Sequence, residues 1–151
     1  MVLSARRRVG ERMPDVTTRI YLAVALGSAL GALARHLVSV SALAVLGPAF
    51  AWGTLMVNVL GSWLIGLYAA LTEPGGRLMA RPATRQFVLG GFCGGFTTFS
   101  VFSLETLLLY GQGRVMLAGV YVGVSILFWL AAVWVGYVMG MRMNQLQGSA
   151  S

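Results

Sequence analysis

Four long stretches without a single charged side chain constrain the fold of this sequence more than any other feature. These charge-free stretches are residues 20–34, 37–72, 86–104 and 115–141. A helix needs about 20 predominantly apolar residues to cross the hydrocarbon core of a bilayer. Gly47-Pro48, a dipeptide typical of a turn, divides the second stretch, so that its first part continues the helix begun by the first stretch. The sequence therefore predicts an all-α membrane protein whose four transmembrane helices lie at about 20–43, 51–72, 86–110 and 114–141.

The composition leaves little outside this transmembrane domain. Apolar residues make up 58% of the 151 residues and charged residues only 10%. We expect one transmembrane domain at 20–141, an arginine-rich N-terminal tail at 1–19 and a short C-terminal tail at 142–151. The sequence shows no nucleophile–base pair, no paired carboxylates and no metal-ligand spacing, which argues against an enzyme. Its one cysteine, Cys93, is typical of packing inside an apolar segment.

The placement of arginine predicts the orientation of the chain in the membrane. All eleven basic residues are arginine, five of them before the first helix and three between the second and the third. The segment around Gly47-Pro48 has none, and the turn at 111–113 is flanked only by Arg114. The positive-inside rule then places both termini in the cytoplasm. The cluster Arg6-Arg7-Arg8 serves this topology or contacts anionic lipid headgroups, and no basic stripe indicates nucleic-acid binding.

The third stretch contains a run of glycines and hydroxyl side chains that disfavours a continuous helix. Residues 90–105 read GGFCGGFTTFSVFSLE. Each glycine costs about 1 kcal/mol relative to alanine inside a helix. Irregular backbone at membrane depth survives only where it is buried in protein or lines a polar cavity. We therefore expect the third helix to be broken near its middle and to present free main-chain groups to an ion.

This run resembles the third-helix motif of the CrcB/Fluc fluoride channels, G-F-C-G-G-x-T-T-F-S-T-F-S-x-E. Residues 53–61, GTLMVNVLG, are similar to the second-helix motif of that family, and residues 31–35, GALAR, to the end of its first helix. The matches follow the family's order and spacing. The resemblance implies a channel of a prokaryotic cell membrane that exports cytoplasmic fluoride passively and lowers its toxicity.

Assembly and cofactor are also implied by the resemblance. Family members form antiparallel, dual-topology-type dimers, and the strong arginine bias leaves open a homodimer or a heterodimer with an oppositely oriented homologue. The main-chain carbonyls of Gly94 and Thr97 from both subunits would hold a structural sodium ion at the dimer interface. Three pairs of glycines spaced four residues apart also predict close helix contacts. These pairs are Gly27/Gly31, Gly119/Gly123 and Gly136/Gly140.

Asn58 and the phenylalanines are the first candidates for an anion pathway. The amide of Asn58, near the middle of the second helix, suits either an interhelical hydrogen bond or an anion. Phe96, Phe99 and Phe102 would share one face of a helix, either as core packing or with their positive ring edges toward an ion. By resemblance Asn58, Phe99 and Phe102 meet fluoride, whereas Phe96 is assigned to packing.

Polar groups beyond these rings extend the predicted pathway. Glu105 is rare for a membrane segment, and it is interpreted equally as a buried structural acid or as a functional group. The residues predicted to continue the fluoride pathway are Ser100, Glu105, Tyr121 and Ser125. Val101 stands where the family commonly has threonine, so one hydroxyl is missing. Arg35 is interpreted as a structural or vestibule residue, where its charge would concentrate anions.

Two other functions remain open from the sequence alone. A small four-helix proton-coupled multidrug exporter would need a carboxylate in its first helix, and residues 20–43 contain none. A non-transporting membrane assembly subunit would tolerate changes at Asn58, Phe99 and Phe102 without loss of activity.

Overall fold

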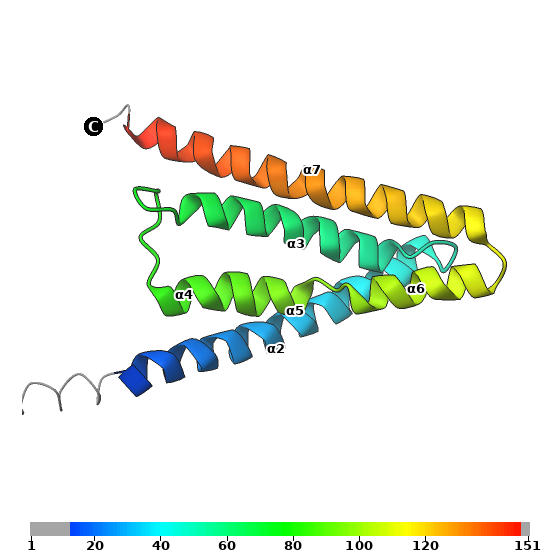
Figure 1. Cartoon of the computed structure of the whole chain (residues 1–151), viewed down its shortest axis with the longest axis horizontal. Helices are drawn as coiled ribbons and strands as arrows, with labels where there is room; N and C mark the ends of the chain where they lie inside the picture. The colour runs from blue at the N-terminus through cyan, green and yellow to red at the C-terminus, as the bar shows by residue number, and fades with distance from the viewer. Residues whose placement is uncertain (1–12, 149–151) are drawn as a thin grey trace, which may run out of the picture.

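The described part of the chain consists of helices and the short segments that connect them (Figure 1). The computed structural model describes residues 13–148, and that range contains no β-strand. Its elements are α2 (Met13–Leu46), α3 (Trp52–Leu71), α4 (Pro82–Gln86), the π-helix η1 (Phe87–Cys93), α5 (Gly94–Phe96), α6 (Ser100–Gly111) and α7 (Val115–Gly148). The prediction of an all-α chain is thus confirmed for residues 13–148. The arginines of the predicted N-terminal tail at 6–8 and 12, and residues 149–151, lie outside the described residues.

The helices make up four apolar segments of membrane-spanning length, as predicted. These segments are Val16–Leu46, Trp52–Leu71, Pro82–Gly111 and Val115–Gln145. The first and last helices are longer than expected, because helix also covers residues 13–19 and 142–148 of the predicted tails. The few polar residues in these two tail segments do not end the helices. Pro14 stands in the first turn of α2, where the missing N–H of proline is tolerated. Both ends of the described chain lie at the same end of the bundle (Figure 1).

Glycines allow the helices to approach closely. A Cβ atom at Gly66 of α3 would collide with the Val133 carbonyl of α7, and one at Gly136 would collide with the Trp63 carbonyl of α3. On the other side of the bundle, a Cβ at Gly31 of α2 would collide with the Phe92 carbonyl of η1. These contacts are the small-residue packing that brings helix backbones together in membranes. They fix α3 against α7, and α2 against the η1–α5 region.

The third segment is bent between α5 and α6. Residues 97–99 are not helical, and Thr97 has an extended conformation with φ −80° and ψ 160°. The Thr98 hydroxyl then accepts a hydrogen bond of 3.2 Å from the Val101 N–H in the first turn of α6. Such a threonine satisfies one of the amides left free at a helix start. The bend therefore lies inside the run of glycines and hydroxyl side chains.

Large apolar side chains cover much of the outer surface. On α2 they include Tyr21, which is 71% exposed, Leu26, Leu33 and Leu37, and on α7 they include Leu127 and Trp134. Contiguous apolar surface of this kind is a feature of proteins that face lipid or another protein. This surface agrees with four helices in a bilayer.

Candidate functional site

Glu105 of α6 lies between two hydroxyl donors from different helices. Thr54 of α3 donates a hydrogen bond of 2.9 Å to its Oε1 atom, and Tyr121 of α7 donates one of 2.7 Å to Oε2. Thr54 is almost fully buried and Tyr121 is fully buried. The carboxylate is therefore held by α3 and α7 at once, and two residues of the predicted pathway, Glu105 and Tyr121, are in direct contact. Thr54, which makes the second contact, was not among the predicted residues.

A row of three side chains runs along α7 behind this carboxylate. Tyr121, Ser125 and Trp129 are spaced four residues apart and so share one face of the helix. Phe102 of α6 packs against both ends of this row, with ring centroids 5.1 Å from Tyr121 and 4.8 Å from Trp129. Ser125 is fully buried between them. We call Tyr121, Ser125 and Trp129 the α7 row.

Phe99 and Phe102 pair with each other, whereas Phe96 belongs to a different cluster. The Phe99 and Phe102 centroids lie 5.7 Å apart, and Phe96 stacks on Phe92 at the same distance. The prediction that Phe96, Phe99 and Phe102 share one face was wrong, because the non-helical residues 97–99 interrupt the helical spacing. Phe102 is buried, but Phe99 is 72% exposed in the single chain. Phe102 therefore packs inside the chain, whereas the Phe99 ring lies on its surface.

Asn58 forms a double hydrogen bond with the main chain of Thr98. Its Nδ2 donates to the Thr98 carbonyl at 2.8 Å, and its Oδ1 accepts from the Thr98 N–H at 2.7 Å. The interpretation of Asn58 as a hydrogen-bonding link between two membrane segments is therefore correct, although one of its two amide hydrogens remains free for another acceptor. Asn58 also lines a cavity of about 220 Å³ together with Thr97, Thr98, Phe99 and Trp129. We call this the inner cavity.

Ser100 and Ser103 lie near the bend, and neither forms a hydrogen bond with Glu105 in the described structure. The Ser100 and Thr98 hydroxyl oxygens lie 3.3 Å apart, and the Ser103 hydroxyl donates to the Phe99 carbonyl at 2.9 Å. Neither serine forms a described hydrogen bond with the α7 row. Of the predicted polar groups, the structure thus joins Glu105 with Tyr121 and places Ser125 beside them, while Ser100 stays with the bend.

Arg35 reaches the bend from α2. Its Nη1 lies 3.5 Å from the carbonyl oxygen of Thr97, a long hydrogen bond. The predicted sodium ligands are the carbonyls of Thr97 and Gly94, so a cation there would share the Thr97 oxygen with the guanidinium. A carbonyl oxygen has two lone pairs, so it can accept a hydrogen bond from the guanidinium and coordinate a cation at the same time. The Thr98 amide, which would bond to the Gly94 carbonyl in a continuous helix, donates to Asn58 instead.

Gly94 is exposed, and a Cβ placed on it would find open space. These carbonyls therefore fit a hard cation that takes oxygen ligands. Two carbonyls do not by themselves complete the coordination shell of such a cation. No cluster of three or more His, Cys, Asp or Glu side chains that could hold a metal occurs within residues 13–148.

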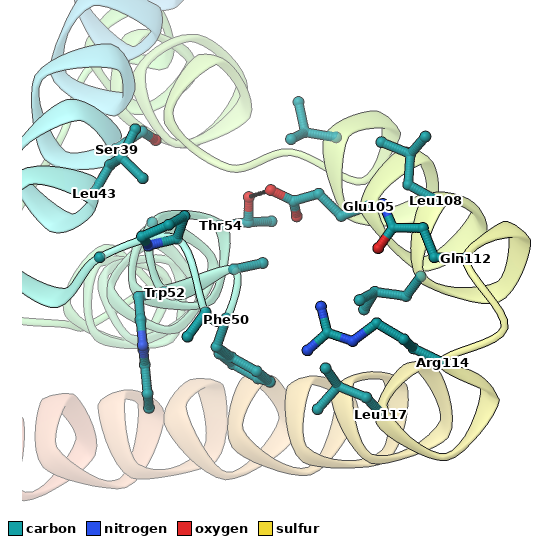
Figure 2. Close-up of a pocket in the computed structure, with 17 residues that line it drawn as sticks. Ser39, Leu43, Phe50, Trp52, Thr54, Glu105, Leu108, Gln112, Arg114 and Leu117 are labelled. Atoms are coloured by element: carbon teal, nitrogen blue, oxygen red, sulfur yellow. Dashed lines mark hydrogen bonds between the residues drawn. The ribbon is translucent and has the colours of Figure 1, made fainter.

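A larger cavity of about 410 Å³ opens at the end of the bundle where α6 turns into α7 (Figure 2). Glu105 projects toward Thr54 at its floor, and the Arg114 guanidinium points into it from the turn. We call this the outer cavity. Val101, which stands where the family commonly has a threonine hydroxyl, also lines the outer cavity. Arg114 and Gln112 were missed as site residues because a turn residue in the sequence carries no information about the direction of its side chain.

The chain is similar in sequence to a known protein family and to several named proteins. A sequence model of the family described as CrcB-like protein, Camphor Resistance (CrcB), matches residues 22–137. The "Fluoride-specific ion channel FluC 1" of Rhodopseudomonas palustris (strain BisB18) is 50% identical over 130 residues, covering 86% of this chain and 92% of that protein. The protein of the same name from Bradyrhizobium diazoefficiens is 48% identical over 130 residues, with 86% and 90% covered. The "Fluoride-specific ion channel FluC" of Methylocella silvestris is 46% identical over 129 residues, with 85% and 98% covered.

Proposed function

The chain belongs to the CrcB-like protein family, and on that premise we propose that it is a fluoride-specific ion channel. The observation that carries the proposal is the match, at 46–50% identity over 90–98% of their length, to proteins named fluoride-specific ion channels. The channel works passively and does not act as an enzyme. Hydrogen fluoride enters a cell as a neutral acid and dissociates in the cytoplasm, so an anion leak driven by the membrane potential removes it.

The proposed pathway leads from the inner cavity along α6 and α7 to the outer cavity. Fluoride is small and strongly hydrated, so a selective path must replace its water with hydrogen-bond donors and still release it. The free amide hydrogen of Asn58 and the ring edges of Phe99 and Phe102 receive the ion. Polar side chains then line the route outward, namely Ser100 near the bend, Ser125 and Tyr121 on α7, and Glu105, which orients the Tyr121 hydroxyl. The hydrogen bond between Tyr121 and Glu105 supports this route, because it keeps the carboxylate occupied by donors rather than facing the anion.

We place two chains antiparallel in the functional channel. The exposed Phe99 ring and the open surface at Gly94 support this arrangement, because a single chain leaves both of them uncovered at the bend. The bend would act as the break in the third helix, with the carbonyls of Gly94 and Thr97 from both chains holding a sodium ion. Sodium would bind these oxygens electrostatically and hold the two bends together. If so, exchanging sodium for a bulky organic cation lowers the melting temperature of the dimer, and an unchanged temperature contradicts the site.

We place the protein in the plasma membrane, and the distribution of its arginines supports an orientation with both termini in the cytoplasm. Arg77, Arg81, Arg85 and Arg142 lie at the end of the bundle that holds both termini, whereas Arg114 lies at the opposite end. The basic end would contact anionic lipid headgroups. Cysteine labelling from either side of the membrane at position 49 and position 75 tests this orientation, and mixed labelling of both positions would indicate dual topology.

Fluoride efflux from liposomes that contain the purified chain alone tests the function. We expect rapid fluoride efflux and no comparable chloride efflux. Phe99→Ile should slow fluoride efflux about tenfold or more, which corresponds to a loss of about 1.4 kcal/mol in ion stabilisation. Phe128→Ile is the matched control, since Phe128 of α7 is 52% exposed and lies outside the proposed pathway.

The negative outcomes of this experiment are separable. A chain that is silent alone but active with an oppositely oriented homologue needs a partner subunit. A chain that is silent in both preparations is not a fluoride channel. Equal efflux from Phe99→Ile and wild type would remove the phenylalanine pair from the pathway.

A further inference from the structure

Two donors of the α7 row are buried without a partner. The Ser125 hydroxyl and the Trp129 indole N–H are shielded from solvent, and neither has a hydrogen-bond partner among residues 13–148. A buried donor without a partner costs about 1–3 kcal/mol. Such groups are rare in native proteins and each calls for an explanation, such as a functional role. Ser125 was predicted from the sequence, but Trp129 was not.

The position of Trp129 sets it apart from the other tryptophan further along the same helix. It lines the inner cavity together with Asn58 and Phe99, and its ring packs edge-on against Phe102 at 4.8 Å with an interplanar angle of 72°. Trp134, in contrast, is 67% exposed on the apolar surface of α7. An indole chosen only to fill space could be replaced by an apolar ring without a polar atom. Trp129 thus lies where the inner cavity meets the α7 row, and its N–H is buried there without a partner.

The α7 row connects the two cavities through donors. From the inner cavity the order is Trp129, Ser125 and Tyr121, and Tyr121 donates to Glu105, which lines the outer cavity. The row offers two donors without a partner, the Trp129 N–H and the Ser125 hydroxyl, along a wall whose other side is Phe102, and it ends at Tyr121, whose hydroxyl is bound to Glu105. An anion moving along it would exchange one donor for the next.

We infer that the Trp129 indole N–H donates a hydrogen bond to fluoride as the ion passes from the inner cavity into the α7 row. This inference rests on the proposed channel function. The indole N–H of Trp129 would be a fluoride ligand in addition to the hydroxyl groups that the sequence predicts. Indole nitrogen donates and cannot accept, so at this position the pathway favours an anion over a cation or a neutral molecule that needs an acceptor.

The test removes the N–H and keeps the shape of the side chain. Trp129 is replaced by benzothienylalanine, in which sulfur stands in place of the indole N–H, and also by phenylalanine. Fluoride efflux from liposomes is measured for each, with Trp134→Phe as the matched control on the same helix. We expect both changes at Trp129 to slow efflux about tenfold or more, as losing a hydrogen bond to a charged group implies. The control should conduct like wild type.

The outcomes separate this inference from the proposed function. Efflux from the benzothienylalanine protein at the wild-type rate would overturn the inference and assign Trp129 to packing, while the channel function would stand. If Trp129→Phe slows efflux but the benzothienylalanine protein does not, the conclusion is the same, because only the phenylalanine changes the shape of the side chain. A wild-type chain that releases no fluoride, alone or with an oppositely oriented homologue, would overturn both.

Discussion

Asn58 and Thr98 are the residue pair that holds the bend against the second span. Two hydrogen bonds of 2.7 and 2.8 Å join the Asn58 side chain to the N–H and the carbonyl of Thr98. Both residues are buried, so neither main-chain group of Thr98 has water as an alternative partner. The same side chain lines the inner cavity. One asparagine thus holds the irregular backbone and still has one amide hydrogen without a described partner.

Asn58→Ala should destabilise the protein as well as slow fluoride efflux. It leaves two buried main-chain groups unsatisfied, at about 1–3 kcal/mol each. For a chain of this size about 1 kcal/mol corresponds to about 2–4 °C in melting temperature. We therefore expect the melting temperature in detergent to fall by several degrees. Ser62→Ala is the control, since Ser62 lines the same cavity from the same helix and has no hydrogen bond described. If Asn58→Ala melts like wild type, the pair does not stabilise the bend.

At the scale of the elements, glycines decide which helix faces meet. The predicted pairs Gly27/Gly31 and Gly136/Gly140 pack inside the chain, the first against η1 and α5 and the second against α3. Around Gly119 and Gly123 of α7, by contrast, a Cβ atom would find open space. Glycines spaced four residues apart therefore occur in two different environments in this protein. Two pairs pack helices together within the chain, and the third lies on the surface of the chain.

Leucine substitutions on α7 should distinguish these two environments. Gly136→Leu would drive a side chain into the main chain at Trp63, so we expect little folded protein. A leucine at Gly123 meets nothing within the described chain. On the proposed dimer, we expect Gly123→Leu to give a folded chain that no longer associates with a second copy and conducts no fluoride. Size-exclusion chromatography and chemical crosslinking measure both effects. A Gly123→Leu protein that remains dimeric and active would place this face against lipid.

At the scale of the whole molecule, the two cavities lie on either side of the cluster formed by Glu105, Thr54 and Tyr121. The outer cavity has the only arginine at its end of the described bundle, Arg114, and its guanidinium points inward (Figure 2). No hydrogen bond or ion pair engages that side chain within residues 13–148. A free positive charge at a low-dielectric opening raises the local concentration of anions.

Arg114→Gln should therefore slow fluoride efflux in a salt-dependent manner. At about 0.01 M salt the Debye length is about 30 Å, so the charge acts across the opening, whereas at about 1 M it is about 3 Å. We expect a several-fold lower efflux rate at low salt and little difference at high salt. Arg142→Gln, near the far end of α7, controls for net charge. An effect of equal size at both salt concentrations would mean that Arg114 acts through packing rather than through its charge.

The sequence by itself determined the helical class, the four spans, the position of the bend and the family. Charge-free length requires membrane helices, and clustered glycines weaken a helix wherever it runs. The tertiary structure alone decided which face of each helix meets which neighbour. These helices are apolar on every side, so no amphipathic pattern marks the inner face. Only packing could therefore reveal the partner of Asn58, the inward direction of Arg114 and the buried N–H of Trp129.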